Sequence, residues 1–331
     1  MSDIFFRSDA GSLLRNKYLL FLGGSNTRAV YKDLVWLLQR GTLISDSSLR
    51  QKLEHSFLGD KLVERSELHK GRNFIEARQF EQNNLKLHFQ FITRCYNEAI
   101  ENLFLSFKTT NQYPDVIFFS SLLWDITRWG PDGVATYKEN MVKLMKLMKS
   151  TLPAETLVIW GTTLPISSDI RNGGFLIKQI EFMKHTMRFE VMEGNLFASR
   201  LVSSYGYDVL DLHYQMRMQI HRRCKDGIHF IKTAVRHVTN LLLTHIAVSW
   251  GHKMPGNYTS KQLLDMIKPL LQCESFNNDN RGICQSDETA MALENQLCVD
   301  QDSMRPVFHR QQNVGNRRIL RGRMRRRRNF Y

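Results

Sequence analysis

Four short apolar segments, separated by stretches with helical periodicity, constrain the fold of this chain most. They are Tyr18–Leu22, Val116–Phe119, Leu157–Trp160 and Tyr207–Leu212. Continuous apolar character of this length is typical of strands that are buried on both faces. A fifth segment, Leu85–Ile92, alternates apolar and polar residues, which predicts a strand with one solvent-exposed face, as at the edge of a sheet.

Apolar residues at helical spacing lie between these predicted strands. The predicted helices are Thr27–Gln39, Tyr137–Lys149, Leu176–Leu201 and Ile231–Trp250. Strands and helices that alternate over roughly 30 residues per unit favour a mainly parallel sheet covered on both sides. We therefore expect an α/β fold, a three-layer α/β/α sandwich.

The dense apolar pattern ends near residue 255, where Pro255 and Gly256 precede a polar stretch. We expect one domain over residues 1–254 and a mostly disordered tail over residues 255–331, because the tail has little apolar surface to offset the entropy of ordering. The amphipathic segment Leu263–Leu271 is the one helix predicted within it.

Most of the net charge of +14 lies in the tail, whose last 31 residues hold ten arginines and one acid, Asp302. The run Arg317–Arg328 is typical of a nuclear-localisation signal, an RNA-binding arm or a contact with acidic membranes. Aromatic residues that could stack on bases are limited to Phe330 and Tyr331 at its end. The tail therefore predicts an acidic partner, RNA or a nuclear-import factor; a purely solubilising tail is the alternative.

The cysteines and the N-terminus indicate the compartment. Five widely spread cysteines without a CxxC pair are typical of free thiols in a reducing compartment. No apolar stretch approaches the ~18 residues of a membrane span, and Met1–Arg15 lacks the pattern of a secretory signal. We therefore expect a cytoplasmic or nuclear protein. The N-glycosylation sequon at Asn257–Thr259 does not fit this expectation, because such sites are used in secreted proteins.

The turn after the first predicted strand reads Leu22-Gly23-Gly24-Ser25-Asn26 and leads directly into a helix. Two glycines permit a tight turn, and a serine at a helix N-terminus lies where N–H groups and the helix dipole stabilise negative charge. The alternative is that Ser25 only caps the helix. A dinucleotide-binding loop or a Walker-type phosphate loop is excluded, because the turn has neither a GxGxxG nor a Gly-Lys-Ser/Thr pattern.

Asp226 precedes His229 by three residues, in a loop ahead of the last predicted helix. The histidine could accept the proton of a nucleophile while the aspartate fixes its tautomer. The alternative is an Asp-Gly turn followed by a surface histidine. Other polar residues at strand ends have catalytic and structural interpretations, with the structural one favoured: Asp125, Asp211 and His213.

Together these segments resemble the GDSL/SGNH hydrolase superfamily and, within it, the PC-esterase domain-containing family. The likeness covers most of residues 13–253. It is carried by Leu22–Val35, Ser121–Arg128, Gly173–Leu176, Asp208–His213, Asp226–His229, Leu241–His245 and Trp250-Gly251.

The resemblance implies a flavodoxin-like sandwich with an open active site. Ser25 matches the family's nucleophile, His229 its general base and Asp226 the acid that orients the base. The implied reaction is transfer of an acyl group from an unknown ester to water through an acyl-serine intermediate. It implies no metal and no organic cofactor.

The chain departs from the family pattern near the nucleophile. Gly24 replaces the aspartate of the usual Gly-Asp-Ser, Ser120 stands in place of the asparagine that donates to the oxyanion hole, and Phe230 replaces a tryptophan. Gly71 is the candidate for the family's glycine donor, so the predicted oxyanion hole consists of Ser25, Gly71 and Ser120.

Three functions follow from this pattern. The first is a serine esterase that uses the predicted triad. The second is an inactive pseudo-esterase that binds a ligand or a protein, because loss of one oxyanion donor costs about 10²–10³ in rate. The third is an RNA- or nucleus-associated protein in which the sandwich supports the arginine-rich tail.

Overall fold

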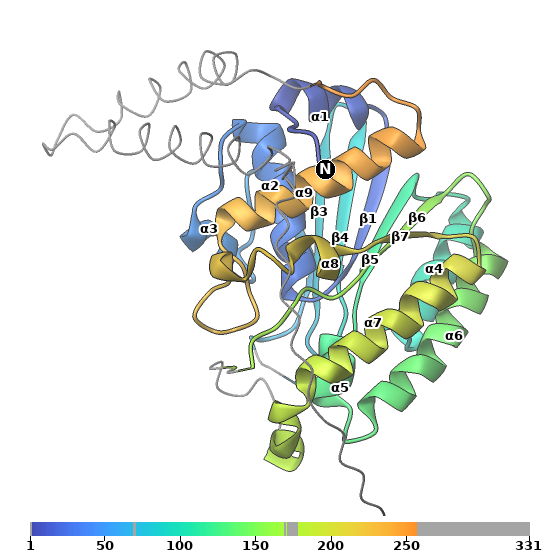
Figure 1. Ribbon diagram of the computed structural model, residues 1–331. Coiled ribbons are helices and arrows are strands. Elements are labelled where there is room, and N and C mark those ends of the chain that lie inside the picture. The colour runs from blue at the N-terminus through green and yellow to red at the C-terminus, as the bar shows by residue number, and fades with distance from the viewer. Residues whose placement is uncertain (1, 69–70, 169, 171–177, 257–331) are drawn as a thin grey trace, which may run out of the picture. The chain divides into compact units, whose positions relative to one another are not determined.

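A sheet of seven strands forms the centre of the folded part of the chain (Figure 1). The computed structural model describes residues 2–68, 71–168, 170 and 178–256. Contacts divide the chain into two units, Met1–Asn257 and Tyr258–Tyr331. The second unit lies outside the described residues, and so do the predicted helix Leu263–Leu271 and the arginine-rich run.

The strand order in the sheet is β2-β3-β4-β1-β5-β6-β7. The five strands from β4 to β7 in this order are parallel, whereas β3 pairs antiparallel with both β2 and β4. The bounds are β1 Tyr18–Gly23, β2 Lys61–Arg65, β3 Glu76–Gln82, β4 Leu85–Phe91, β5 Val116–Ser120, β6 Leu157–Gly161 and β7 Asp208–Leu210.

Helices cover both faces of the sheet, which confirms the predicted α/β/α sandwich. Figure 1 shows α1, α2 and α9 on one face and α4, α6 and α7 on the other. The helices are α1 Arg7–Leu13, α2 Ser25–Arg40, α3 Asp46–Arg50, α4 Glu98–Thr110, α5 Leu123–Arg128, α6 Gly133–Thr151, η1 Lys178–His185, α7 Met187–Ser204, α8 Leu212–Met216, η2 Ile220–Arg222 and α9 Lys232–Ser249. None of these is both long enough and apolar enough to cross a membrane.

The central strand β1 shows why both faces need cover. Leu19 and Phe21 belong to the core beneath α2 and α9, while Leu20 and Leu22 belong to the core beneath α4, α6 and α7. All four side chains are at most 1% exposed. Since neighbouring side chains of a strand point to opposite faces, a continuous apolar strand is stable only between two layers of helices.

One expectation about the sheet is wrong. The strand predicted over Leu85–Ile92, which is β4, is not at the edge, because β3 pairs with its outer side. Its alternation is real: Leu85, Leu87 and Phe89 are buried and Lys86 is half-buried. The edge on this side of the sheet is formed by β2, a strand whose residues are mostly exposed and charged.

The predicted helix Leu176–Leu201 is divided in the structure. A 3₁₀ helix, η1, precedes α7, and Leu176 lies outside the described residues. The other three predicted helices correspond to α2, α6 and α9, with ends within a few residues of the expected ones.

The parallel strands that follow β1 in the sequence lie on both sides of it: β4 on one side and β5 on the other. β1 is therefore a switch point of the sheet, and the chain leaves it into α2. In open parallel sheets, ligands bind outside the carboxyl ends of the strands at such a switch point. The carboxyl ends of β1, β4 and β5 are Gly23, Phe91 and Ser120.

Candidate active site

Ser25 is the first residue of α2, directly after the turn that ends β1. Gly23 makes this turn close-packed: a Cβ there would lie 2.0 Å from Thr27 Oγ1 and 2.6 Å from the carbonyl oxygen of Ser120. The first hydrogen bond of the helix runs from the N–H of Arg28 to Gly24 O at 3.0 Å. The N–H groups of the first three helical residues therefore have no acceptor within the helix, and the positive end of its dipole lies at Ser25.

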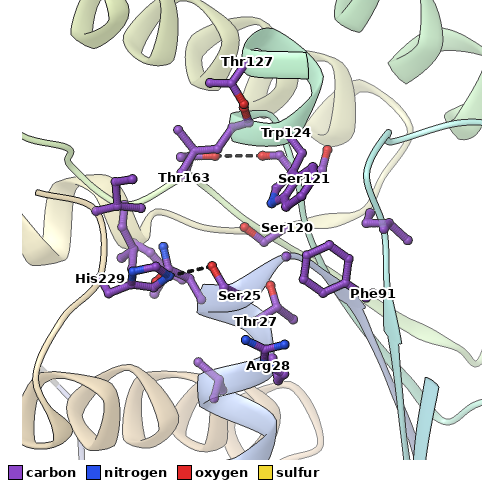
Figure 2. Close-up of a pocket in the computed structure, with 18 of the residues that line it drawn as sticks. Ser25, Thr27, Arg28, Phe91, Ser120, Ser121, Trp124, Thr127, Thr163 and His229 are labelled. Carbon is purple, nitrogen blue, oxygen red and sulfur yellow. Dashed lines mark hydrogen bonds between the residues drawn. The ribbon is translucent and has the colours of Figure 1, made fainter. Parts of the chain in front are cut away.

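The side chains of Ser25, His229 and Asp226 form a hydrogen-bonded chain. Ser25 Oγ lies 2.7 Å from His229 Nε2 (Figure 2), and His229 Nδ1 lies 2.6 Å from Asp226 Oδ2. The serine and the histidine are 204 residues apart in sequence. The sheet brings them together, because α2 and the loop before α9 meet at the carboxyl ends of the strands.

The spacing of three residues between Asp226 and His229 is explained by the loop. Asp226 Oδ1 accepts the N–H groups of Ile228 at 2.9 Å and of His229 at 3.0 Å, so the carboxylate closes its own turn. Gly227 has a φ of 82°, a left-handed conformation that favours glycine. Cys224 N–H donates to His229 O at 2.7 Å and anchors the histidine backbone.

These contacts determine the charge of the carboxylate. Burial alone would raise the pKa of Asp226, but the hydrogen bonds from the His229 ring and from the N–H groups of Ile228 and His229 outweigh it. The net result is a pKa well below the usual range of an aspartate. Asp226 is therefore a carboxylate that accepts from Nδ1–H, which leaves His229 Nε2 to accept from Ser25.

A pocket opens beside Ser25 and His229 (Figure 2). Figure 2 shows Thr163 on the histidine side of the wall and Phe91 and Trp124 on the other side. The rest of the wall is mixed. Its apolar side chains are Val30, Leu68, Phe74, Ile92, Phe118, Leu123, Leu164, Leu212, Ile228 and Val238, and its charged ones are Arg28, Lys52 and Arg128. A pocket that combines apolar surface with polar groups is the usual form of a small-molecule site.

Of the predicted oxyanion-hole residues, the structure brings Ser25 and Ser120 together but not Gly71. Ser120 ends β5 and lines the pocket. Gly71 is exposed in the loop between β2 and β3, outside the pocket wall. The same loop reaches the pocket through Leu68 and Phe74, on either side of Gly71 in the sequence.

Ser121 follows Ser120 and is held from the opposite side of the pocket. Thr163 Oγ1 donates to Ser121 O at 2.7 Å, a contact drawn in Figure 2. Thr163 N–H in turn donates to Asn195 Oδ1 on α7 at 2.9 Å. These bonds fix the end of β5 against the segment that follows β6, so the two walls of the pocket are tied together.

Asp125 has a structural role in the described conformation. Its buried carboxylate accepts the N–H of Cys95 at 2.9 Å and of Leu122 at 3.2 Å, and so joins the segments that follow β4 and β5. Leu122 has a φ of 116°, which side chains rarely adopt, and Asp125 stabilises that turn. Burial raises the pKa of Asp125 to about 6, although its hydrogen bonds and Arg94 act against the increase.

The other polar candidates at strand ends also anchor loops. Asp211 Oδ1 caps α8 through Tyr214 N–H at 3.0 Å and accepts from Thr162 Oγ1 at 2.9 Å. His213 Nδ1 lies 2.9 Å from Thr163 O. No group of three or more His, Cys, Asp or Glu side chains that could hold a metal ion occurs within the described residues.

A buried cluster of six charged side chains supports α2 beneath Ser25. Arg28 Nη1 lies 2.5 Å from Glu76 Oε2, and Arg78 bonds to Asp60 at 2.8 and 2.9 Å. The members are Arg28, Lys32, Glu54, Asp60, Glu76 and Arg78. Three cations face three carboxylates, so the charges balance where burial would otherwise make each one costly.

Trp124 and Arg28 are pocket residues to which the sequence patterns assigned no role. An isolated tryptophan among apolar residues is typical of a core, so no signal distinguished it. Phe230, the third departure from the family pattern, is 5% exposed in the core beneath α2 and α9 and does not line the pocket.

The chain is similar in sequence to two human proteins. It is 38% identical over 256 residues to PC-esterase domain-containing protein 1A of Homo sapiens, a match that covers 76% of this chain and 56% of the relative. It is 33% identical over 279 residues to PC-esterase domain-containing protein 1B of Homo sapiens, covering 83% of this chain and 64% of the relative. The chain thus spans less than two thirds of the length of either protein, and no family model matches it.

Two solved structures match this chain remotely. A GDSL-like lipase from Bacteroides thetaiotaomicron has 10% identity and a TM-score of 0.42, over 73% of this chain and 95% of its own. A lipase/acylhydrolase from Enterococcus faecalis has 15% identity and a TM-score of 0.40, over 73% of this chain and 99% of its own. Neither is similar enough to inform the site.

Proposed function

The matched part of the chain belongs to the family of PC-esterase domain-containing proteins, and on this premise we propose that it is a serine esterase that works through an acyl-serine intermediate. The observation that carries the proposal is the chain of hydrogen bonds from Ser25 Oγ through His229 to Asp226, which opens into a pocket. A serine hydroxyl is a weak nucleophile until an adjacent base accepts its proton.

In the first step, Ser25 Oγ attacks the carbonyl carbon of the ester. The Oγ–C bond forms, the proton of the hydroxyl moves to His229 Nε2, and the carbonyl electron pair moves onto the oxygen. Asp226 accepts from Nδ1–H and stabilises the imidazolium. The donors that we propose for the oxyanion are the N–H groups at the start of α2, which have no acceptor within the helix, and the Ser120 hydroxyl in the pocket wall.

In the second step, the tetrahedral intermediate collapses. The bond from carbon to the alcohol oxygen breaks, and His229 gives its proton to that oxygen, which leaves an acyl-serine and a free alcohol. Water then repeats the sequence: His229 takes one proton from it, the new C–O bond forms, and the Ser25–carbon bond breaks as the proton returns to Ser25.

One observation favours a second candidate, a pseudo-esterase that binds an ester or a related ligand without turnover. Ser120 offers a single short hydroxyl donor at the end of β5. If the other donors do not compensate, the oxyanion is poorly stabilised and the reaction slows by about 10²–10³.

Labelling with a fluorophosphonate probe and turnover of a p-nitrophenyl ester test the two candidates. We expect the full chain to be labelled at Ser25 and to release nitrophenol, and both signals to disappear in Ser25→Ala and His229→Ala. Ser106→Ala is the matched control, because Ser106 is exposed on α4 and donates to Leu103 O of the same helix. A wild type that is folded, yet neither labelled nor faster than Ser25→Ala, contradicts the esterase and supports the pseudo-esterase.

A further inference from the structure

The indole of Trp124 packs against Gly24, the residue that precedes Ser25. A Cβ at Gly24 would lie 3.2 Å from Trp124 Cδ1 and 3.4 Å from Trp124 Nε1. The shorter of these distances is tighter than most real Cβ contacts, so a side chain at this position would press on the ring. The glycine therefore makes room for the N–H edge of the indole beside the candidate nucleophile.

The position of the indole is fixed from several sides. The ring of Phe91 meets it edge to face with centroids 5.3 Å apart, and the Arg128 guanidinium lies 5.0 Å from its centroid. The next residue, Asp125, anchors the start of α5 through Leu122 and Cys95. Trp124 is thus a preorganised part of the pocket wall rather than a loose surface ring.

The indole N–H of Trp124 has no acceptor among the residues that the structure describes, although it lines the pocket. Trp36 Nε1 donates to Thr42 Oγ1 at 3.1 Å and Trp129 Nε1 donates to Thr93 O at 2.8 Å. Trp160 Nε1 also has no acceptor among the described residues, but it is buried in the core, whereas Trp124 lines the pocket. Figure 2 shows the nitrogen of Trp124 on the side of the ring that faces Ser120 and Ser25. Tryptophan N–H groups in packed surroundings usually have a partner, so the pocket is where an acceptor would come from.

We propose that Trp124 Nε1–H donates a hydrogen bond to the ester oxygen that becomes negative when Ser25 attacks. The inference rests on the esterase proposal and adds a catalytic residue to it. The indole nitrogen is a donor only, so a substrate oxygen that enters the pocket can accept from it in place of water. Its packed aromatic surroundings keep the donor in place before the charge on that oxygen develops.

The rate of phosphonylation of Ser25 isolates this contribution, because the phosphoryl oxygen of the probe develops the same charge. In that reaction Ser25 Oγ forms a bond to phosphorus, fluoride leaves, and His229 takes the proton. For Trp124→Phe we expect the rate at saturating probe to fall about 10²-fold. We expect the half-saturating concentration to stay within about threefold of wild type, since the lost bond forms mainly in the transition state.

Two further variants separate the N–H from the ring. Replacement of Trp124 by 3-benzothienylalanine keeps the size and shape of the ring and exchanges N–H for sulfur, so it should slow the reaction as much as Trp124→Phe. Trp129→Phe removes an N–H that is bonded to the backbone and lies outside the pocket wall, so it should react at the wild-type rate. Thermal unfolding of each variant shows whether the fold is intact.

The outcomes are distinguishable. A wild type that is not labelled at Ser25 contradicts the esterase proposal, and the role of Trp124 with it. A labelled wild type whose benzothienyl analogue reacts equally fast contradicts only the role of Trp124. That role is also contradicted if the analogue changes the half-saturating concentration and not the rate at saturation.

Discussion

Asp226 has two tasks at once: its Oδ2 orients His229 and its Oδ1 closes the turn that carries the histidine. An asparagine can keep one of these contacts but would leave the imidazole with the wrong tautomer or no orienting acceptor. For Asp226→Asn we therefore expect the esterase rate to fall by about 10⁴. Rate measurements beside the exposed helix-cap control Asp132→Asn check this, and a loss below about tenfold contradicts it.

The lowered pKa of Asp226 predicts a pH dependence of stability as well. A carboxylate with a folded pKa below its unfolded value of about 3.9 contributes stability above that value and loses it as the pH falls through the folded pKa. The difference in unfolding free energy between wild type and Asp226→Asn should therefore be constant from pH 5 to 7 and shrink below about pH 4. Denaturant titrations at several pH values measure it.

Asp125 predicts the opposite sign. Because burial raises its folded pKa to about 6, the folded state binds a proton more readily than the unfolded state between about pH 4 and 6. Wild type should therefore lose unfolding free energy relative to Asp125→Asn as the pH rises through this interval, by an amount on the order of 2 kcal/mol. Chemical denaturation of both proteins at pH 4.5 and 7 checks this; a difference that does not change with pH contradicts it.

At the scale of elements, α2 depends on the buried ion cluster. Glu76 on β3 is fully buried and contacts both Arg28 and Arg78. Glu76→Gln would remove the carboxylate that pairs with Arg28, whereas Arg78 would keep Asp60. The cluster would then hold one uncompensated buried positive charge, which typically costs about 3–5 kcal/mol. Urea unfolding should show this loss, whereas Glu81→Gln at an exposed position of the same strand should change stability by less than about 0.5 kcal/mol.

The elements that the sequence predicts best are those with an unambiguous apolar period. The strands β1, β5 and β6 are continuous apolar runs, and α2 and α9 have clear apolar stripes. The strands β2 and β3 were not predicted, because β2 is mostly charged and β3 buries polar side chains, Glu76 and Arg78, that pair with each other. Because β3 was not predicted, β4 was wrongly expected at the edge of the sheet.

The residues of the candidate site, too, are predicted only where a local sequence pattern identifies them. Ser25, Asp226 and His229 are recognisable because each belongs to a short local pattern, and the structure places all three within hydrogen-bond distance. Gly71 lies outside the pocket wall although Phe74 of the same loop lines it, because the residues of a long loop that reach the pocket depend on its folded path, which no local pattern contains. Trp124 was missed for the same reason: its closeness to Gly24 exists only in the folded sheet.

At the scale of the whole molecule, both hydrophobic cores consist of residues between Phe5 and Ala247 in the described part of the chain. Removal of the last sixteen residues, Asn316–Tyr331, should therefore leave the unfolding midpoint and the esterase rate unchanged. If the arginine run serves RNA binding or nuclear import, two of the roles that its sequence favours, RNA retention and nuclear location should be lost in the same deletion. Unchanged retention and location would contradict those roles for the run.

The 204 residues that separate Ser25 from His229 have a consequence for synthesis. The ribosome adds residues from the N-terminus, at about 5–20 per second, so the serine emerges at least ~10 s before the histidine. During the first part of that interval β1 also lacks β4 and β5, its two partners in the sheet, because they are synthesised after it. A nascent or truncated chain that ends before His229 would thus carry no triad, so labelling of Ser25 would report that synthesis had passed His229 and that the fold around both residues had formed.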